Sequence, residues 1–237
     1  MPDPSRRAIL ITRPEPGASE SAARLAALSF RSVLAPVLTI RALPTRLPDP
    51  ARVQAILAAS GNAIAGLPEN FRTLPLLAVG AATAARARAA GFTSVTSAEG
   101  DAAALAALTA AQCRPQAGPL LLVAGRDQRK DLAASLRAQK FRVLRRVVYT
   151  TEPVRALPEA AIAALRAEKI SAALFFSAAT AHVFVRLATN AGLARHLTGV
   201  DAISIGQPAA VALKALPWRR IRVAARPNQD AMLAMLS

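Results

Sequence analysis

The segment from Leu10 to Thr39 recurs without a gap as Leu121 to Thr150. Nine of the thirty aligned positions are identical, and three of these nine are alanine pairs in an alanine-rich chain. The shared order of sequence patterns is stronger evidence for a repeat than the identities are. Each copy has a short apolar run, a turn with proline or glycine, an amphipathic stretch, a Phe-Arg pair and a second extended run. A chain that repeats such a unit is expected to form two similar halves with a cleft between them.

A second internal similarity supports the two-half organisation. Residues 78–84 resemble residues 204–210, and the segment 60–63 resembles 177–181. In each case the segment follows an apolar run and opens a helical pattern. The chain therefore has the order unit A, unit B, a second unit A and a second unit B.

Apolar runs of strand length alternate with helical patterns along the whole chain. The predicted strands are 9–12, 34–38, 54–58, 76–79, 94–96, 120–123, 143–149, 172–176, 202–205 and 221–224, and the predicted helices are 19–28, 82–90, 102–113, 131–139, 158–168, 181–190, 208–216 and 229–235. This alternation predicts right-handed parallel strand–helix–strand units. The predicted fold class is α/β, with two similar parallel-sheet domains, an interdomain cleft and a two-stranded β ladder that joins the domains.

The ladder follows from two long extended segments, 35–43 and 142–153, which close the two A units. If these linker strands pair, the residues between them form one domain. We therefore predict a discontinuous first domain of residues 1–36 plus 152–237, and a second domain of residues 40–148.

The chain carries 30 basic and 14 acidic residues, a formal net charge of +16. This balance favours a polyanionic partner, although arginine that only decorates exposed helix faces explains it equally well. The arginine residues are spread out with little aromatic interleaving, so a small polyanion is favoured over nucleic acid. One cysteine and two distant histidines exclude a disulfide framework and predict no metal site.

The first residues contain too few apolar side chains for a signal-peptide core, and no stretch of about eighteen residues lacks charges and turn formers. We therefore expect a soluble cytoplasmic protein with no membrane contact.

Polar residues follow several predicted strands at their carboxyl ends, where open α/β sheets bind ligands. Each of these turns precedes a helix, whose free N–H groups attract carboxylates. The alternative for Ser60, Thr83 and Ser177 is a helix-capping role alone. The candidate binding residues are Thr12, Arg13, Ser60, Asn62, Gly80, Thr83, Ser177, Thr180 and Gly206.

Common catalytic motifs are absent from the sequence: it has no G-x-G-x-x-G, no P-loop, no nucleophile elbow and no outstanding pair of carboxylates. A catalyst without these parts would act mainly by binding and orienting a molecule that is already reactive.

Short motifs in a characteristic order resemble the uroporphyrinogen-III synthase family over nearly the whole chain. They are ILITRP at 9–14, S-x-N-A at 60–63, G-x-x-T-A at 80–84, Ala-Gly-Phe at 90–92, G-D-A at 100–102, Val-Tyr at 148–149, FFSAATAHVF at 175–184 and SIG at 204–206. No single motif is specific, but their order and spacing agree with the family. The family's layout, two α/β domains joined by a ladder, is the one that the repeats predict independently.

The resemblance implies a cofactor-free, cyclising hydro-lyase of tetrapyrrole and heme biosynthesis. Its substrate would be hydroxymethylbilane, a linear tetrapyrrole with eight carboxylates, closed to uroporphyrinogen III with loss of water and inversion of ring D through a spiro intermediate. The electron-rich pyrrole expels the hydroxide, so the protein needs only to fold the chain and supply a proton. By position, Tyr149 matches the family's ladder tyrosine and is the candidate general acid, with packing at the hinge as its alternative. We expect a monomer.

The chain departs from the family pattern at three places. Ala209 stands where the family usually has threonine, Gln207-Pro208 replaces the common leading proline, and Ala124-Gly125-Arg126 replaces Arg-Gly. The loss of the second threonine puts one hydroxyl contact in doubt. Two alternatives stay open at this point: a non-catalytic two-domain protein that binds a polyanionic small molecule, and, less favoured, a nucleic-acid-binding protein.

Overall fold

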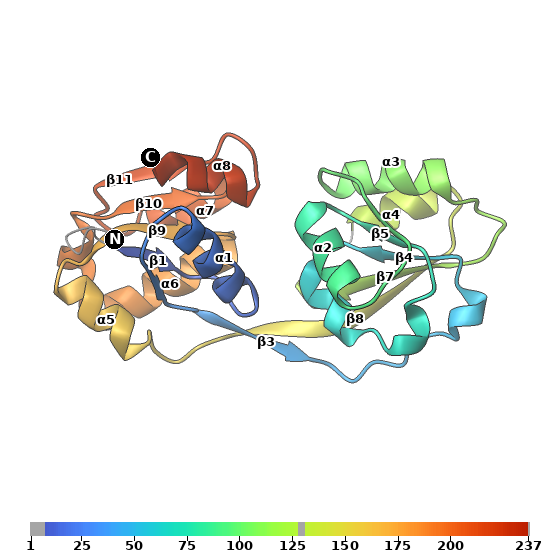
Figure 1. Cartoon of the computed structure of the whole chain (residues 1–237), viewed down its shortest axis with the longest axis horizontal. Helices are drawn as coiled ribbons and strands as arrows, with labels where there is room; N and C mark the ends of the chain where they lie inside the picture. Colours follow the sequence, from blue (N-terminus) through green and yellow to red (C-terminus); the bar gives the residue numbers. More distant parts are fainter. Residues whose placement is uncertain (1–7, 128–130, 237) are drawn as a thin grey trace. The chain divides into compact units, whose positions relative to one another are not determined.

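A computed structural model describes residues 8–127 and 131–236, which form two compact units. Unit 1 comprises the chain up to residue 39 and from residue 152 onward, and unit 2 comprises residues 40–151. Residues 1–7 of the predicted first domain lie outside the described residues. The chain passes from one unit to the other twice, within β3 (Leu38–Ala42) and β8 (Val143–Pro153), as Figure 1 shows.

Unit 1 is built on a five-stranded sheet in the order β11-β10-β9-β1-β2, and all its neighbouring strands are parallel. Its strands are β1 (Ala8–Ile11), β2 (Ser32–Leu34), β9 (Ile170–Phe175), β10 (Asp201–Ser204) and β11 (Arg220–Val223). The central strands β1 and β10 are buried along their whole length because helices cover both faces of the sheet.

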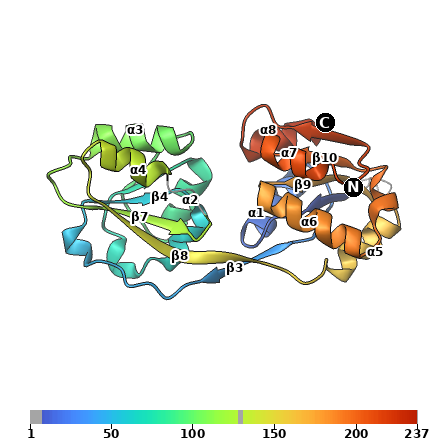
Figure 2. The ribbon, with the colours of Figure 1, turned by 180° about the vertical axis from the view of Figure 1, so that it is seen from behind.

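Two apolar clusters form on the two faces of this sheet. On one face α1 (Gly17–Ala27) and α8 (Gln229–Leu233) pack against Ile9, Ile11 and Leu174. On the other face, seen from behind in Figure 2, lie α5 (Glu159–Arg166), α6 (Ala178–Asn190) and α7 (Gln207–Leu213). The 3₁₀ turns of unit 1 are Ala194–Leu197 and Ala234–Leu236.

Unit 2 contains a six-stranded sheet in the order β3-β8-β7-β4-β5-β6, and the pairs among β8, β7, β4, β5 and β6 are parallel. The remaining strands are β4 (Ala55–Ala58), β5 (Leu76–Ala78), β6 (Val95–Ser97) and β7 (Leu120–Gly125). Helices α3 (Ala102–Gln112) and α4 (Asp131–Ala138) cover one face, and α2 (Ala81–Ala89) covers the other with the 3₁₀ helix η2 (Gly61–Gly66). Two further 3₁₀ turns are Pro50–Arg52 and Glu69–Phe71.

The two sheets have the same order once the internal repeat is taken into account. The repeated segments place β7 and β8 at the positions of β1 and β2, and the B units place β4, β5 and β6 at the positions of β9, β10 and β11. The predicted α/β class with two similar parallel sheets is therefore confirmed.

The pairing of β3 with β8 confirms the ladder. The Leu43 N–H donates to the Val148 carbonyl at 2.9 Å and the Val154 N–H donates to the Val37 carbonyl at 3.0 Å. Partner numbers fall along β8 as they rise along β3, which identifies antiparallel pairing.

One predicted strand is wrong: residues 34–38 are not a single strand. β2 ends at Leu34 and β3 begins at Leu38, with Pro36 between them. Proline has no N–H for a sheet ladder, so the strand is interrupted there and resumes as part of the two-stranded connection.

An ion pair links β10 to the residue that precedes the edge strand β11. The Arg219 Nε donates to Asp201 Oδ1 at 2.7 Å, and the carboxylate is 9% exposed. This hydrogen bond lowers the pKa of the Asp201 carboxyl by more than burial raises it. A lowered folded-state pKa stabilises the protein above the ordinary aspartate pKa and ceases to do so as the pH falls through the lowered value.

We therefore expect Asp201→Asn to reduce the free energy of unfolding by about 1 kcal/mol at pH 7, since the arginine is half exposed. The difference from the wild type should shrink as the pH falls below about 3.8, the ordinary value. Urea denaturation at pH 7, 5 and 3 measures it. A difference that stays constant with pH would show that the charge of this carboxyl is not responsible.

Candidate functional site

In unit 1 the sheet order reverses between β1 and β9. The chain continues from β1 outward to β2 and from β9 outward to β10, and helices α1 and α6 therefore cross opposite faces of the sheet. Open α/β sheets bind ligands beyond the carboxyl ends of the two strands at such a point. Arg13 follows β1 there, and Phe176 follows β9.

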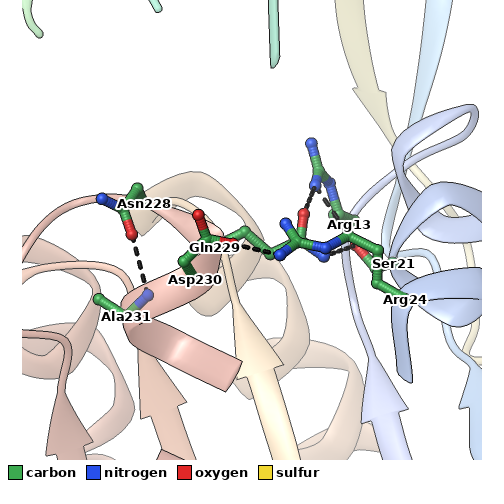
Figure 3. A network of polar contacts seen from close by, with 7 residues as sticks. All are labelled: Arg13, Ser21, Arg24, Asn228, Gln229, Asp230 and Ala231. Atoms are coloured by element: carbon green, nitrogen blue, oxygen red, sulfur yellow. Dashed lines mark hydrogen bonds and ion pairs between the residues drawn. The ribbon is translucent and has the colours of Figure 1, made fainter. Parts of the chain in front are cut away.

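The Arg13 guanidinium is held at this edge by residues from two helices (Figure 3) and by Phe176. Its Nη1 donates to Ser21 Oγ on α1 and to Gln229 Oε1 on α8, both at 3.3 Å, and the Gln229 Nε2 donates to Ser21 Oγ at 3.2 Å. The Arg13 Cζ lies 4.4 Å from the centroid of the Phe176 ring, a cation–π distance. Arginine keeps its charge at every physiological pH, so this edge of unit 1 carries a positioned positive charge.

Gly17, at the start of α1, lets the guanidinium lie against the helix. A Cβ atom there would lie 2.4 Å from Arg13 Nε, closer than real contacts allow. Gln229 lies on α8, so the position of Arg13 depends on how α8 is docked. Further from Arg13, Arg24 forms an exposed ion pair with Asp230, and within α8 the Asn228 Oδ1 accepts the Ala231 N–H at 2.9 Å and caps the helix (Figure 3).

The other candidates of unit 1 make contacts within the fold. Thr12 is fully buried and its hydroxyl donates to the Leu174 carbonyl at 2.6 Å, which joins β1 to β9. Ser177 Oγ accepts the Thr180 N–H at 3.1 Å and caps α6, while the Thr180 hydroxyl donates to the Ser177 carbonyl at 2.8 Å. Gly206 precedes the seven-residue helix α7 without a capping side chain. Their contact with a ligand stays a prediction.

In unit 2 the candidates gather where β4 and β5 end. Ser60 Oγ accepts the Asn62 N–H at 3.2 Å and caps η2. Gly80 precedes α2 in an extended conformation and no side chain caps this helix, so the capping alternative holds for Ser60 but not for Thr83. Thr83 is buried in the first turn of α2. The buried Ala209 occupies the equivalent place in α7, where its methyl group packs in the core of unit 1.

Tyr149 lies on β8 with its ring against the end of β7. The strand pairing shifts by one residue there, so that Tyr149 pairs with Gly125. A Cβ at Gly125 would lie 2.6 Å from the Tyr149 Cζ and 2.8 Å from its Oη. The ring is buried in the core beneath α2, and the Arg145 Nη2 donates to the Gly125 carbonyl at 3.1 Å. Because residue 125 is glycine, the Tyr149 phenol can lie against the carboxyl end of the central strand β7.

The structure brings together Thr12, Arg13, Ser177 and Thr180 at one edge of unit 1, and Ser60 with Asn62 in unit 2. Sequence analysis missed three residues at these edges: Phe176, Gln229 and Arg86. Phe176 directly precedes Ser177, and Arg86 lies one helical turn after Thr83. Both could therefore have been found from their closeness in sequence to a predicted site residue. Gln229 lies 216 residues from Arg13, and nothing in the local sequence indicated that the two side chains meet.

The internal repeat shows how the two units differ. The position of Arg13 corresponds to Ala124, that of Phe176 to Ala59, and that of Arg24 to Ser135. These small residues line a pocket of about 570 Å³ between α3 and α4, together with Asp101, Ala102, Ala103, Leu122, Asp131 and Leu132. At this place in unit 1 the side chains of Arg13, Phe176 and Arg24 take up the space, whereas the smaller residues of unit 2 leave it as a pocket.

Within residues 8–127 and 131–236 no group of three or more His, Cys, Asp or Glu side chains is arranged to hold a metal ion. Over the same ranges, no helix has both the length and the apolar character that a membrane crossing requires.

Comparison with known proteins identifies one family. The family described as "HEM4: Uroporphyrinogen-III synthase HemD" matches residues 19–234. No curated protein matches the chain significantly.

Among solved structures, uroporphyrinogen-III synthetase from Helicobacter pylori matches with a TM-score of 0.60 and 18% identity, over 97% of this chain and 98% of that chain. A mutant uroporphyrinogen III synthase from the extremely thermophilic bacterium Thermus thermophilus matches with a TM-score of 0.48 and 21% identity, over 97% of both chains. The Helicobacter structure supports the fold, and the family match covers most of the sequence. The chain therefore belongs to the uroporphyrinogen-III synthase family, as its sequence motifs indicated.

Proposed function

We propose that this protein cyclises hydroxymethylbilane to uroporphyrinogen III, with loss of water and inversion of the terminal ring. The observation that carries the proposal is the family match over residues 19–234. The positioned charge of Arg13 at the carboxyl edge of unit 1 and the net charge of +16 suit a substrate with eight carboxylates. No observation favours the non-catalytic alternative.

Carboxylate groups would bind to the strand-end turns of both units. In unit 1 Arg13 supplies a charge, with Ser177, Thr180 and the turn at Gly206 beside it. In unit 2 the first N–H groups of α2, after Gly80, have no capping side chain and offer donors near Thr83, Ser60 and Asn62. Thr12 would act through the bond that joins β1 to β9. We further propose that the protein is a cytoplasmic monomer.

Tyr149 would donate the proton that the departing hydroxyl needs. Hydroxide is a poor leaving group, and the pyrrole nitrogen supplies most of the electron push, so a single positioned proton donor completes the step. Ring closure then requires only that the two ends of the bound chain meet, which is a matter of orientation. The close contact with Gly125 supports this assignment, because it holds the phenol oxygen at a strand end.

The decisive test is the isomer that forms. Freshly prepared hydroxymethylbilane closes spontaneously to the type I isomer, and we expect the purified protein to direct it to type III. Chromatographic separation of the oxidised products measures the ratio. Type I product alone at every protein concentration would refute the proposed function.

Gln229→Ala should weaken substrate binding by about five- to thirty-fold in KM, because Arg13 loses the hydrogen bond that positions its charge. The maximal rate should change little. Arg24→Gln is the matched control: it removes a charge from the same helix pair but only from an exposed ion pair, and its KM should equal that of the wild type. The KM of the wild type should also rise with salt, since exposed charges are screened over about 10 Å at 0.1 M.

Tyr149→Phe should lower kcat by about tenfold to a hundredfold while the protein stays folded, because only the phenol oxygen is removed. Initial rates of type III formation and a thermal unfolding curve measure the two effects. Wild-type rates in the Phe variant would assign Tyr149 to packing alone, and the proton would then come from water.

A further inference from the structure

Arg86, on α2, places a second arginine at the carboxyl edge of unit 2. Its Nη1 donates to Asn62 Oδ1 at 2.8 Å, and both side chains are half-buried. Asn62 belongs to the turn that follows β4, a central strand next to the point where the order of this sheet reverses. The guanidinium therefore lies at the position in unit 2 where such sheets bind ligands.

The turn is shaped to admit this side chain. A Cβ atom at Gly61 would lie 2.5 Å from Arg86 Cδ and 3.0 Å from its Nη1. The arginine stem thus runs along the bare backbone of Gly61, between its helix and the end of β4. A larger residue at 61 would force the Arg86 side chain to shift.

The bond to Arg86 also fixes which way the Asn62 amide points. A carbonyl oxygen that accepts from arginine leaves the Nδ2 amino group on the opposite side of the amide, with two N–H donors. Among the described residues, none accepts a hydrogen bond from Asn62 Nδ2. The pair thus presents a positive charge and neutral N–H donors at the same turn, and both kinds of group bind carboxylates.

The internal repeat indicates that the fold does not need this pair. The position of Arg86 corresponds to Ala212 in α7, and that of Asn62 corresponds to Ala179 in α6. Unit 1 builds the same strand and helix arrangement with alanine at both places. Conversely, the position of Arg13 carries Ala124 in unit 2, so Arg13 and Arg86 come from non-equivalent positions of the repeat.

We propose that Arg86 and Asn62 together bind one carboxylate group of the substrate, and that Arg86 is a substrate-binding residue of this enzyme. The inference rests on the proposed function for the identity of the substrate.

The test separates binding from a purely structural contact by adding a negative charge without breaking the contact. In Asn62→Asp the new carboxylate still accepts the Arg86 hydrogen bond, so folding is preserved, but it replaces the amide donors and repels a substrate carboxylate. Arg86→Gln removes the charge itself. Arg88→Gln is the matched control, because it removes the same charge two residues further along α2, where the side chain donates to the Val95 carbonyl.

Two measurements are made on each full-length variant. One is the KM and kcat for type III formation; the other is the affinity for uroporphyrin, an octacarboxylate that needs no turnover, followed by its fluorescence. We expect Asn62→Asp and Arg86→Gln to raise both KM and the uroporphyrin Kd about tenfold or more, with kcat within about threefold of the wild type. Arg88→Gln should leave both unchanged, and all three should melt near the wild-type temperature.

The outcomes distinguish the two proposals. If the wild type forms type III and Asn62→Asp, folded, has wild-type KM and Kd, the contact is structural and the inference is overturned. If the wild type forms only type I but binds uroporphyrin and loses affinity in Asn62→Asp, the proposed function fails and the binding pair stands. If the wild type neither directs the isomer nor binds uroporphyrin, both are overturned.

Discussion

The parallel pairing of β1 with β9 is the constraint on which unit 1 depends. It joins strands separated by about 160 residues, and Ile9, Leu10 and Ile11 pair with Ala172, Ala173 and Leu174. Closing so long a loop is entropically unfavourable, and burial of both strands in two apolar cores offsets that loss. The same pairing sets the ends of the two strands next to each other, so Arg13 meets Phe176. The pairing of β1 with β9 therefore both forms the core of unit 1 and places Arg13 and Phe176 at its proposed binding edge.

The internal repeat makes the differences between the units informative. Both units form the same strand order, and a side chain that the other unit replaces by alanine at the equivalent position is not needed for that order. Arg13 in unit 1 and Arg86 with Asn62 in unit 2 are such side chains.

Most of the architecture could be predicted from sequence because the signals were local. Strands and helices follow from apolar period and turn residues, and the repeat supplied the division of the chain. Pro36 was a local signal too, and it was missed: it divides the predicted strand 34–38. Ser60 and Ser177 were placed at strand ends by the same local patterns, and both cap the helices that follow.

The partners of the candidate residues were beyond local signals. Gln229 reaches Arg13 only because α8 packs beside α1, and this contact depends on the whole of unit 1. The Arg86–Asn62 bond depends on how α2 lies over η2, and it also needs a missing side chain at Gly61. A sequence shows which groups are available, but their distances follow from tertiary packing.

The insertion of unit 2 between β2 and β9 has a consequence for biosynthesis on the ribosome. Residues 40–151 are contiguous, so the inserted unit can complete its core soon after its last strand emerges. The other unit must wait, because β1, synthesised first, lacks its central neighbour until residues 170–175 have been added. During that interval an apolar strand and the buried face of α1 remain uncovered. The N-terminal segment, which is synthesised first, is therefore the part of the nascent chain most prone to misassembly.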